Sequence, residues 1–149
     1  MNKYFTNRVY VDANIIIDDF FYKENKKEAN RDSYSALQFL FGNNRFECYL
    51  GSFSLILFIK TLKSYKVKEN IIIEHIKTLL KKFQIVEFSQ KDIENSFENL
   101  SDCKETEDHF QYALCKKMRC FYFVTKNKNH FKDYKNIEII VPKKIREIQ

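Results

Sequence analysis

The sequence predicts an α/β fold in which helices cover both faces of a parallel sheet. Short apolar, β-branched segments alternate with helical patterns along the 149 residues, which is typical of crossover connections between parallel strands. Residues 120–124 (CFYFV) are nearly all apolar, as expected for a strand buried on both faces. With only two Gly and one Pro and no linker or repeat, residues 1–149 are predicted to form one domain.

The first half of the chain is predicted to contain two strands and three helices. A strand over residues 8–12 runs directly into a helix over 15–22, and Asp18 and Asp19 are expected at the solvent end of that helix. The polar stretch 23–31 is predicted to be a loop, and Asp32 or Ser33 can cap a helix that reaches residue 41. A second strand covers 46–50, and Ser54 can cap the apolar helix 55–65.

The second half continues the alternation. In residues 68–82, apolar side chains recur at helical spacing, and a short strand follows at 85–88. Ser89 can begin a helix to residue 100, and a further helix is predicted over 105–117, before the strand 120–124. A last strand covers 137–141, and Pro142 is well suited to open a terminal helical turn.

Composition excludes several classes of site. The two glycines rule out a Gly-rich phosphate loop, and the four cysteines contain no C-x-x-C pair that would indicate a zinc knuckle. The three histidines are scattered and form no triad with Ser or Cys. The longest apolar run, residues 53–59, is too short to cross a bilayer, and no signal peptide leads the chain. We therefore expect a cytoplasmic protein with reduced thiols and no membrane contact.

Two carboxylates are candidates for chemistry. Asp12 lies at the end of the first strand, where open α/β sheets place ligands; it can hold a hard divalent cation or simply cap the next helix. Asp108 belongs to an acidic cluster that also contains Asp102, Glu105 and Glu107. Acids gather in the first turn of helices for electrostatic reasons alone. Asp108, however, shares a helical face with Gln111 and could point toward Asp12.

Polar and basic residues follow the fourth strand. Thr125 and Asn127 can orient a phosphate or a water, although both are also common turn formers. Lys126, together with Lys128, Lys132 and Lys135, makes a basic stretch that fits either phosphate contact or a solvated loop. The net charge of +6 is compatible with RNA as a partner, but coding bias toward Lys would explain it equally well.

Several segments together resemble the PIN domain family, the fold of many prokaryotic toxin–antitoxin ribonucleases. Residues 11–18 (VDANIIID) resemble its strand, D-x-N and apolar helix, and residues 107–113 (EDHFQYA) resemble its E-D helix. Residues 120–127 (CFYFVTKN) with Phe131 resemble its C-D-y-I-v-T-r-N-x-x-D-F strand and turn, and 139–142 (IIVP) its closing segment. Residues 52–58 (SFSLILF) fall where the family has Ser or Thr and then an acid. The motifs span nearly the whole chain in the family's order.

The resemblance implies a three-layer sandwich with a five-stranded parallel sheet of order 3-2-1-4-5. It also implies an endoribonuclease site that uses Mg²⁺ or Mn²⁺, with Asp12 and Asp108 as catalytic, metal-binding carboxylates. The supporting, substrate-binding groups that match the motifs or lie beside them are Asn14, Ser54, Thr125, Lys126 and Asn127. The resemblance also implies RNA, an antitoxin-like protein and a second copy of the chain as possible partners.

Three departures set this chain apart from the family pattern. The second acid falls at Leu57, the acid of the C-D-y segment is Phe121, and the acid of the D-F pair is His130. Phe121 is expected to be the most damaging, because it would make one wall of the crevice apolar. Glu107 should point about 100° away from Asp108 on the same helix.

Three interpretations of the function remain open at this point. The chain is a ribonuclease-derived protein whose activity is weakened or lost, or a non-catalytic RNA-binding module, or a protein that dimerises or binds an antitoxin-like partner through exposed aromatic surface.

Overall fold

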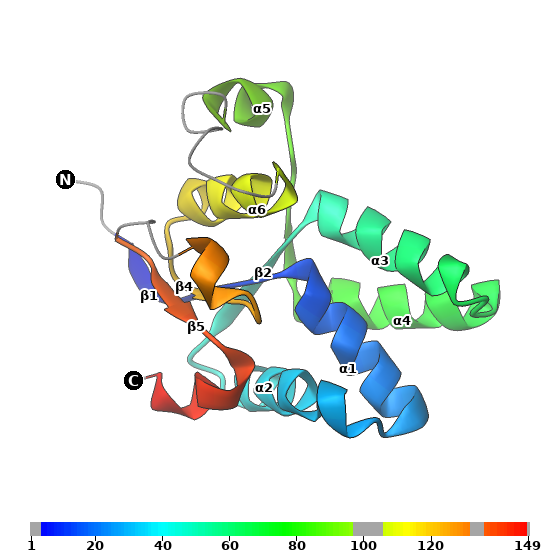
Figure 1. Cartoon of the computed structure of the whole chain (residues 1–149). Helices are drawn as coiled ribbons and strands as arrows, with labels where there is room; N and C mark the ends of the chain where they lie inside the picture. Colours follow the sequence, from blue (N-terminus) through cyan, green and yellow to red (C-terminus); the bar gives the residue numbers. More distant parts are fainter. Residues whose placement is uncertain (1–3, 97–105, 132–135, 149) are drawn as a thin grey trace.

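The protein contains one five-stranded parallel sheet. The computed structural model describes residues 4–96, 106–131 and 136–148. The strands are β1 (Phe5–Val11), β2 (Glu47–Gly51), β3 (Gln84–Val86), β4 (Cys120–Val124) and β5 (Glu138–Ile140). Their order is β3-β2-β1-β4-β5, and every neighbouring pair is parallel. The expected order 3-2-1-4-5 is therefore confirmed, and β1 is the central strand (Figure 1).

Helices connect successive strands and cover both faces of the sheet. Those of α type are α1 (Ala13–Asn25), α2 (Arg31–Phe41), α3 (Ser52–Ser64), α4 (Glu69–Lys82), α5 (Gln90–Ser96) and α6 (Thr106–Lys117). Short 3₁₀ turns are η1 (Glu28–Asn30), η3 (Lys128–Phe131) and η4 (Pro142–Glu147). In Figure 1, α5 and α6 lie on the opposite side of the sheet from α1 and α2. The expected helix end at residue 100 and helix start at residue 105 lie outside the described residues.

The predicted loop over residues 23–31 is wrong in part. Helix α1 continues to Asn25 and ends where Lys26 adopts a left-handed conformation with φ of 53°. The backbone N–H of Lys26 donates to the carbonyl oxygen of Tyr22 at 2.8 Å and so satisfies a carbonyl at the end of the helix. The chain turns again through η1 before α2 begins. A polar sequence here forms helix because only one face of α1 needs to be apolar.

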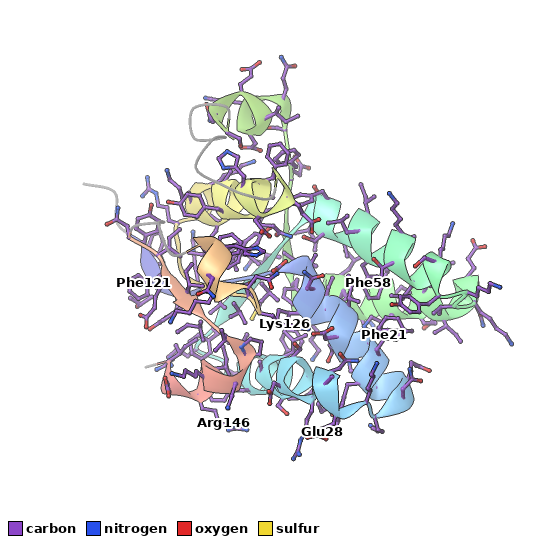
Figure 2. All side chains as sticks on the ribbon, in the orientation of Figure 1. Phe21, Glu28, Phe58, Phe121, Lys126 and Arg146 are labelled. Atoms are coloured by element: carbon purple, nitrogen blue, oxygen red, sulfur yellow. The ribbon has the colours of Figure 1, made fainter. Side chains whose placement is uncertain are left out.

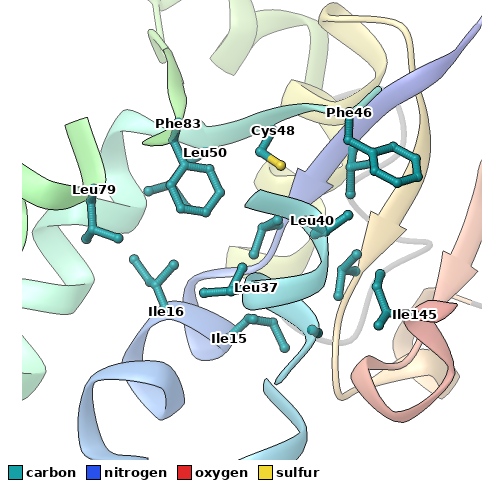
Figure 3. Packing of buried hydrophobic residues seen from close by; sticks show 14 of the residues in the cluster. Ile15, Ile16, Leu37, Leu40, Phe46, Cys48, Leu50, Leu79, Phe83 and Ile145 are labelled. Carbon is teal, nitrogen blue, oxygen red and sulfur yellow. The ribbon is translucent and has the colours of Figure 1, made fainter. Parts of the chain in front are cut away.

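The two faces of the sheet have separate cores because alternate side chains of a strand point to opposite sides. Val9 and Val11 of β1 join a large aliphatic cluster with α1, α2, α3 and α4. Figure 3 shows Ile15 and Ile16 of α1 close to Leu37 of α2 within this cluster. On the other face, residues of β1, β2, β4, α6 and η3 make a largely aromatic cluster that includes Tyr10, Tyr49, Leu114, Phe123 and Phe131.

Three of the four cysteines lie in the core of the protein. Cys48, Cys115 and Cys120 are buried free thiols, while Cys103 lies outside the described residues. None of the helices in the described part of the chain is both long enough and apolar enough to cross a membrane.

Candidate functional site

Strand pairing brings Asp12 and Thr125 together at the carboxyl edge of the sheet. Val11 of β1 pairs with Val124 of β4, so the next residue on each strand emerges at the same place. The backbone N–H of Asp12 donates to the carbonyl oxygen of Val124 at 3.0 Å. The Thr125 hydroxyl then donates to Asp12 Oδ2 at 2.7 Å. Although 113 residues separate them, their contact follows from the register of two central strands.

Asp12 also caps the first helix. Its backbone is extended, with φ of −66° and ψ of 146°, and Oδ1 accepts from the backbone N–H of Asn14 at 3.4 Å. Asn14 itself has an exposed side chain. Of the two roles that the sequence left open for Asp12, capping of the next helix is therefore present.

A buried glutamine links Asp12 to the neighbouring helices. Gln111 of α6 donates through Nε2 to Asp12 Oδ1 at 3.4 Å and to Ser54 Oγ at 3.2 Å. Its Oε1 accepts from the Tyr10 hydroxyl at 2.6 Å. The sequence placed Gln111 on the face of Asp108 but gave it no role in the site. A long polar side chain in the middle of an otherwise apolar helical face was the available signal.

Burial dominates the electrostatics of Asp12. Only 1% of the residue is exposed, and loss of hydration raises the pKa of its carboxyl from 3.8 to about 6. Hydrogen bonds from Thr125 and Asn14 act in the opposite direction, and the negative charge of Asp108 raises the pKa further. Asp12 is therefore a carboxylate that holds its proton more tightly than usual.

Asp108 forms a second polar pair on the same side of the sheet. It lies one helical turn before Gln111 on α6, is buried, and influences the pKa of Asp12. Its Oδ2 lies 2.6 Å from Nδ1 of His130 in η3. Glu107, by contrast, is exposed at the preceding position of the helix, as its angular offset predicted.

The basic and amide groups lie at the outer rim. The Lys126 side chain is 45% exposed, and its Nζ lies 2.7 Å from Asp18 Oδ2. Asn127 donates its backbone N–H to the Thr125 hydroxyl at 3.1 Å. Lys132 and Lys135 of the predicted basic stretch lie outside the described residues, as do Asp102 and Glu105 of the acidic cluster.

The expectation that Asp18 and Asp19 simply face solvent is wrong. Asp18 accepts from Lys126 and also from the Ser33 hydroxyl at 3.1 Å, so it ties α1 to α2 and to the loop after β4. Asp19 is buried, with Lys23 Nζ at 3.1 Å from its Oδ2. The packing of α2 and α4 around α1 covers side chains that an isolated helix would leave in water.

Phe121 does not line the crevice. It lies near the start of β4, packs against the aliphatic core cluster and contacts the Tyr122 ring edge-on at 4.8 Å between centroids. At roughly 3.3 Å per residue, about 13 Å of strand separates it from position 125. Figure 2 shows Phe121 well apart from Lys126. The expectation that Phe121 is the most damaging departure is therefore wrong.

The other two departures do lie close to the polar cluster. Leu57 of α3 is half-buried, and it follows Ser54 by three residues on the same helical face. His130 contacts Asp108 directly. Among the residues that the structure describes, no group of three His, Cys, Asp or Glu side chains is placed to hold a metal ion.

Comparisons with known proteins agree with this architecture. No protein-family model matches the chain. The chain is similar to Ribonuclease VapC1 of Aquifex aeolicus, at 26% identity over 145 residues and 95% of each sequence. Among solved structures it resembles a chain of a toxin–antitoxin complex from Klebsiella pneumoniae, with a TM-score of 0.65 and 19% identity, covering 90% of this chain and 97% of that one.

A second solved structure gives the same result. A chain of VapBC2 from Rickettsia felis, bound to a DNA fragment from its promoter, has a TM-score of 0.61 and 19% identity, covering 90% of this chain and 98% of that one. The comparisons confirm the PIN-like fold and the resemblance to ribonucleases of toxin–antitoxin systems that the motifs indicated.

Proposed function

We propose that this PIN-domain chain, which descends from metal-dependent ribonuclease toxins, binds RNA at the carboxyl edge of its sheet and has weakened or lost catalytic activity. The observation that carries the proposal is the state of the two candidate catalytic carboxylates. Asp12 is buried and hydrogen bonded on both oxygens, and Asp108 is hydrogen bonded to His130. Two of the family's acids are thus present, but the protein's own side chains already hydrogen bond to them.

The side chains at this edge fit a resident Mg²⁺ or Mn²⁺ poorly. In metal-dependent nucleases such an ion activates water and stabilises the charge that develops at phosphorus, and Mg²⁺ requires near-octahedral oxygen ligands. Asp12 and Asp108 are the only expected ligands placed here, because Leu57 and His130 stand where the family has acids. Gln111, Thr125 and His130 already contact three of the four oxygens of these carboxylates, so an ion would compete with these contacts.

RNA remains the ligand that the surrounding charges favour. Lys126 and the exposed Lys128 lie directly after β4, beside the crevice, and the chain carries a net charge of +6. Lys side chains bind phosphates without regard to sequence, and such binding weakens steeply as salt rises. Asn14 and Asn127 lie at the same rim and can orient the sugar–phosphate backbone. RNA binding also agrees with the cytoplasmic location that the sequence predicted.

A cleavage assay separates weakened activity from lost activity. Highly purified wild-type protein, Asp12→Asn and Asp108→Asn are incubated with labelled RNA and Mn²⁺. Slow cleavage by the wild type alone would show residual activity that depends on the two carboxylates. No cleavage by any of the three would show loss. Equal cleavage by all three would reveal a contaminant and would reject Asp12 and Asp108 as catalytic residues.

A salt titration tests RNA binding itself. Affinity of the wild type for single-stranded RNA should fall about tenfold or more between about 50 mM and 200 mM salt if several phosphates are contacted. Binding that is absent at low salt would contradict the proposed function.

An antitoxin-like protein is a second proposed partner. The solved neighbours are complexes of toxins with antitoxins. In this chain, α3, the residue that follows it and α4 leave several large apolar side chains exposed, namely Ile56, Tyr65, Ile71, Ile73 and Leu80. Such a surface favours a helix-in-groove contact. Light scattering after size exclusion, on the chain alone and co-expressed with the product of an adjacent reading frame, distinguishes a heteromeric complex from a homodimer. Leu80→Glu should abolish the complex if this surface forms it.

A further inference from the structure

The contact between Asp108 and His130 is built into the framework of the fold. His130 lies in η3, where its backbone N–H donates to the carbonyl oxygen of Asn127 at 2.9 Å. The next residue, Phe131, is fully buried, with its ring centroid 4.6 Å from that of Phe123 in β4. The buried ring and the short turn together hold the imidazole over α6. The 2.6 Å contact is therefore fixed by tertiary packing rather than formed by a free surface side chain.

The geometry assigns the two nitrogens of His130 different roles. Nδ1 of His130 lies 2.6 Å from Asp108 Oδ2, and a carboxylate that accepts this hydrogen bond requires the hydrogen to be on Nδ1. The Nε2 atom then faces away from this bond, because the two nitrogens lie on opposite sides of the ring. The side chain is 35% exposed, and no hydrogen bond joins Nε2 to a described residue.

The position of His130 gives this pair its significance. The motif TKNKNHF places His130 where the resembling pattern T-r-N-x-x-D-F has an acid. An acid at this place would stand beside Asp108, and the two negative charges would repel each other unless a cation lay between them. Histidine at the same place gives Asp108 a hydrogen-bond partner, so no ion is needed between them.

We propose that His130 replaces a divalent metal ion as the partner of Asp108, so that the crevice excludes Mg²⁺ and Mn²⁺ and engages RNA without them. The inference rests on the proposed RNA-binding function. One of the two Asp108 oxygens, Oδ2, already contacts Nδ1 of His130, and both oxygens of Asp12 accept hydrogen bonds, from Gln111 and Thr125. The second nitrogen, Nε2, is left at the rim of the crevice to contact the RNA backbone.

Calorimetric titration of Mn²⁺ tests the exclusion of metal. We expect no saturable binding to the wild type and a gain of at least about tenfold in affinity for His130→Asp, which restores a ligand beside Asp108. Asn129→Asp is the matched control, because it adds the same charge at an exposed neighbouring position of η3 and should leave binding unchanged. Circular dichroism establishes that each variant is folded. The second variant combines Leu57→Glu with His130→Asp, which brings the acids at this site to four.

The calorimetric outcomes are decisive in both directions. Wild-type protein that binds Mn²⁺ as tightly as His130→Asp would overturn the inference. So would folded His130→Asp and double variants that both fail to bind better than the Asn129→Asp control. A gain confined to the variants that carry the acid at position 130 would support it.

RNA binding supplies the second readout. Affinity of the wild type for single-stranded RNA should be the same in EDTA and in Mn²⁺, and His130→Ala should lower it by about threefold to tenfold through loss of one polar contact. A wild-type affinity that rises several-fold with Mn²⁺ would overturn the inference. If the wild type bound no RNA in either condition, the proposed function would fail, while the calorimetry would still decide whether His130 excludes the metal.

Discussion

Substitution of Asp12 by Asn should make the protein more stable at neutral pH. The carboxyl of Asp12 is buried, and burial raises its pKa from 3.8 to about 6. Because the folded protein binds this proton more tightly than the unfolded chain does, the contribution of Asp12 to stability is largest at low pH. It is lost progressively as pH rises through about 6. Asn has nearly the same shape and carries no charge, so it avoids this loss.

The magnitude follows from the two pKa values. Each unit of pKa corresponds to about 1.4 kcal/mol, so the full effect above pH 6 is about 3 kcal/mol. Part of this gain is offset because Asn must reorganise the hydrogen bonds with Thr125 and Gln111. The pH dependence of the stability difference between Asp12→Asn and the wild type isolates the effect of the charge better than the absolute difference does. Between about pH 5 and about pH 8, the stability advantage of Asp12→Asn over the wild type should grow by about 1.5 kcal/mol.

Urea unfolding at the two pH values measures this difference directly. Glu24→Gln is the control, because it removes one negative charge from an exposed position of the same helix α1 and should change stability by less than about 0.5 kcal/mol. An advantage of Asp12→Asn that is the same at both pH values would refute the reasoning. It would mean that the pKa of Asp12 is not raised in the folded protein.

Three further predictions concern the surroundings of the crevice. Gly51→Ala should destabilise the protein by about 1–3 kcal/mol in urea unfolding, because the added Cβ would lie 2.6 Å from the Tyr10 hydroxyl. Thr125→Val should cost about 1–3 kcal/mol at about pH 8, since it removes the 2.7 Å hydrogen bond to Asp12, and less at about pH 5, where Asp12 is largely protonated. Lys128→Ala should weaken RNA binding uniformly across sequences and reduce the slope of log affinity against log salt by about 1.

The fold was accessible from the sequence because the relevant signals are local. Apolar alternation and spacing give each strand and helix its identity, and the apolar segment 120–124 is buried on both faces as its composition predicted. The boundaries were less accurate. The first strand ends at Val11, one residue earlier than predicted, and α1 extends to Asn25. Helix ends depend on capping and on packing against neighbouring elements, which periodicity does not contain.

The contacts within the site could be predicted only in part from local sequence patterns. Strand-end position identified Asp12 and Thr125, and helical spacing put Asp108 and Gln111 on one face. Nothing in the spacing showed that Gln111 reaches Asp12 across 99 residues, or that His130 meets Asp108 across 22. The same limit explains the error over Phe121. Its place in the motif suggested that it lines the site, but it lies near the start of β4, far from the carboxyl end of that strand.

The sequence by itself thus determined the elements, the layered parallel architecture and the residues from which a site could be made. Tertiary structure alone decided which donors meet which carboxylates. The physical reason is that secondary structure depends on side chains a few positions apart, whereas each contact in the crevice depends on the register of β1 with β4 and on how α6 and η3 pack over them.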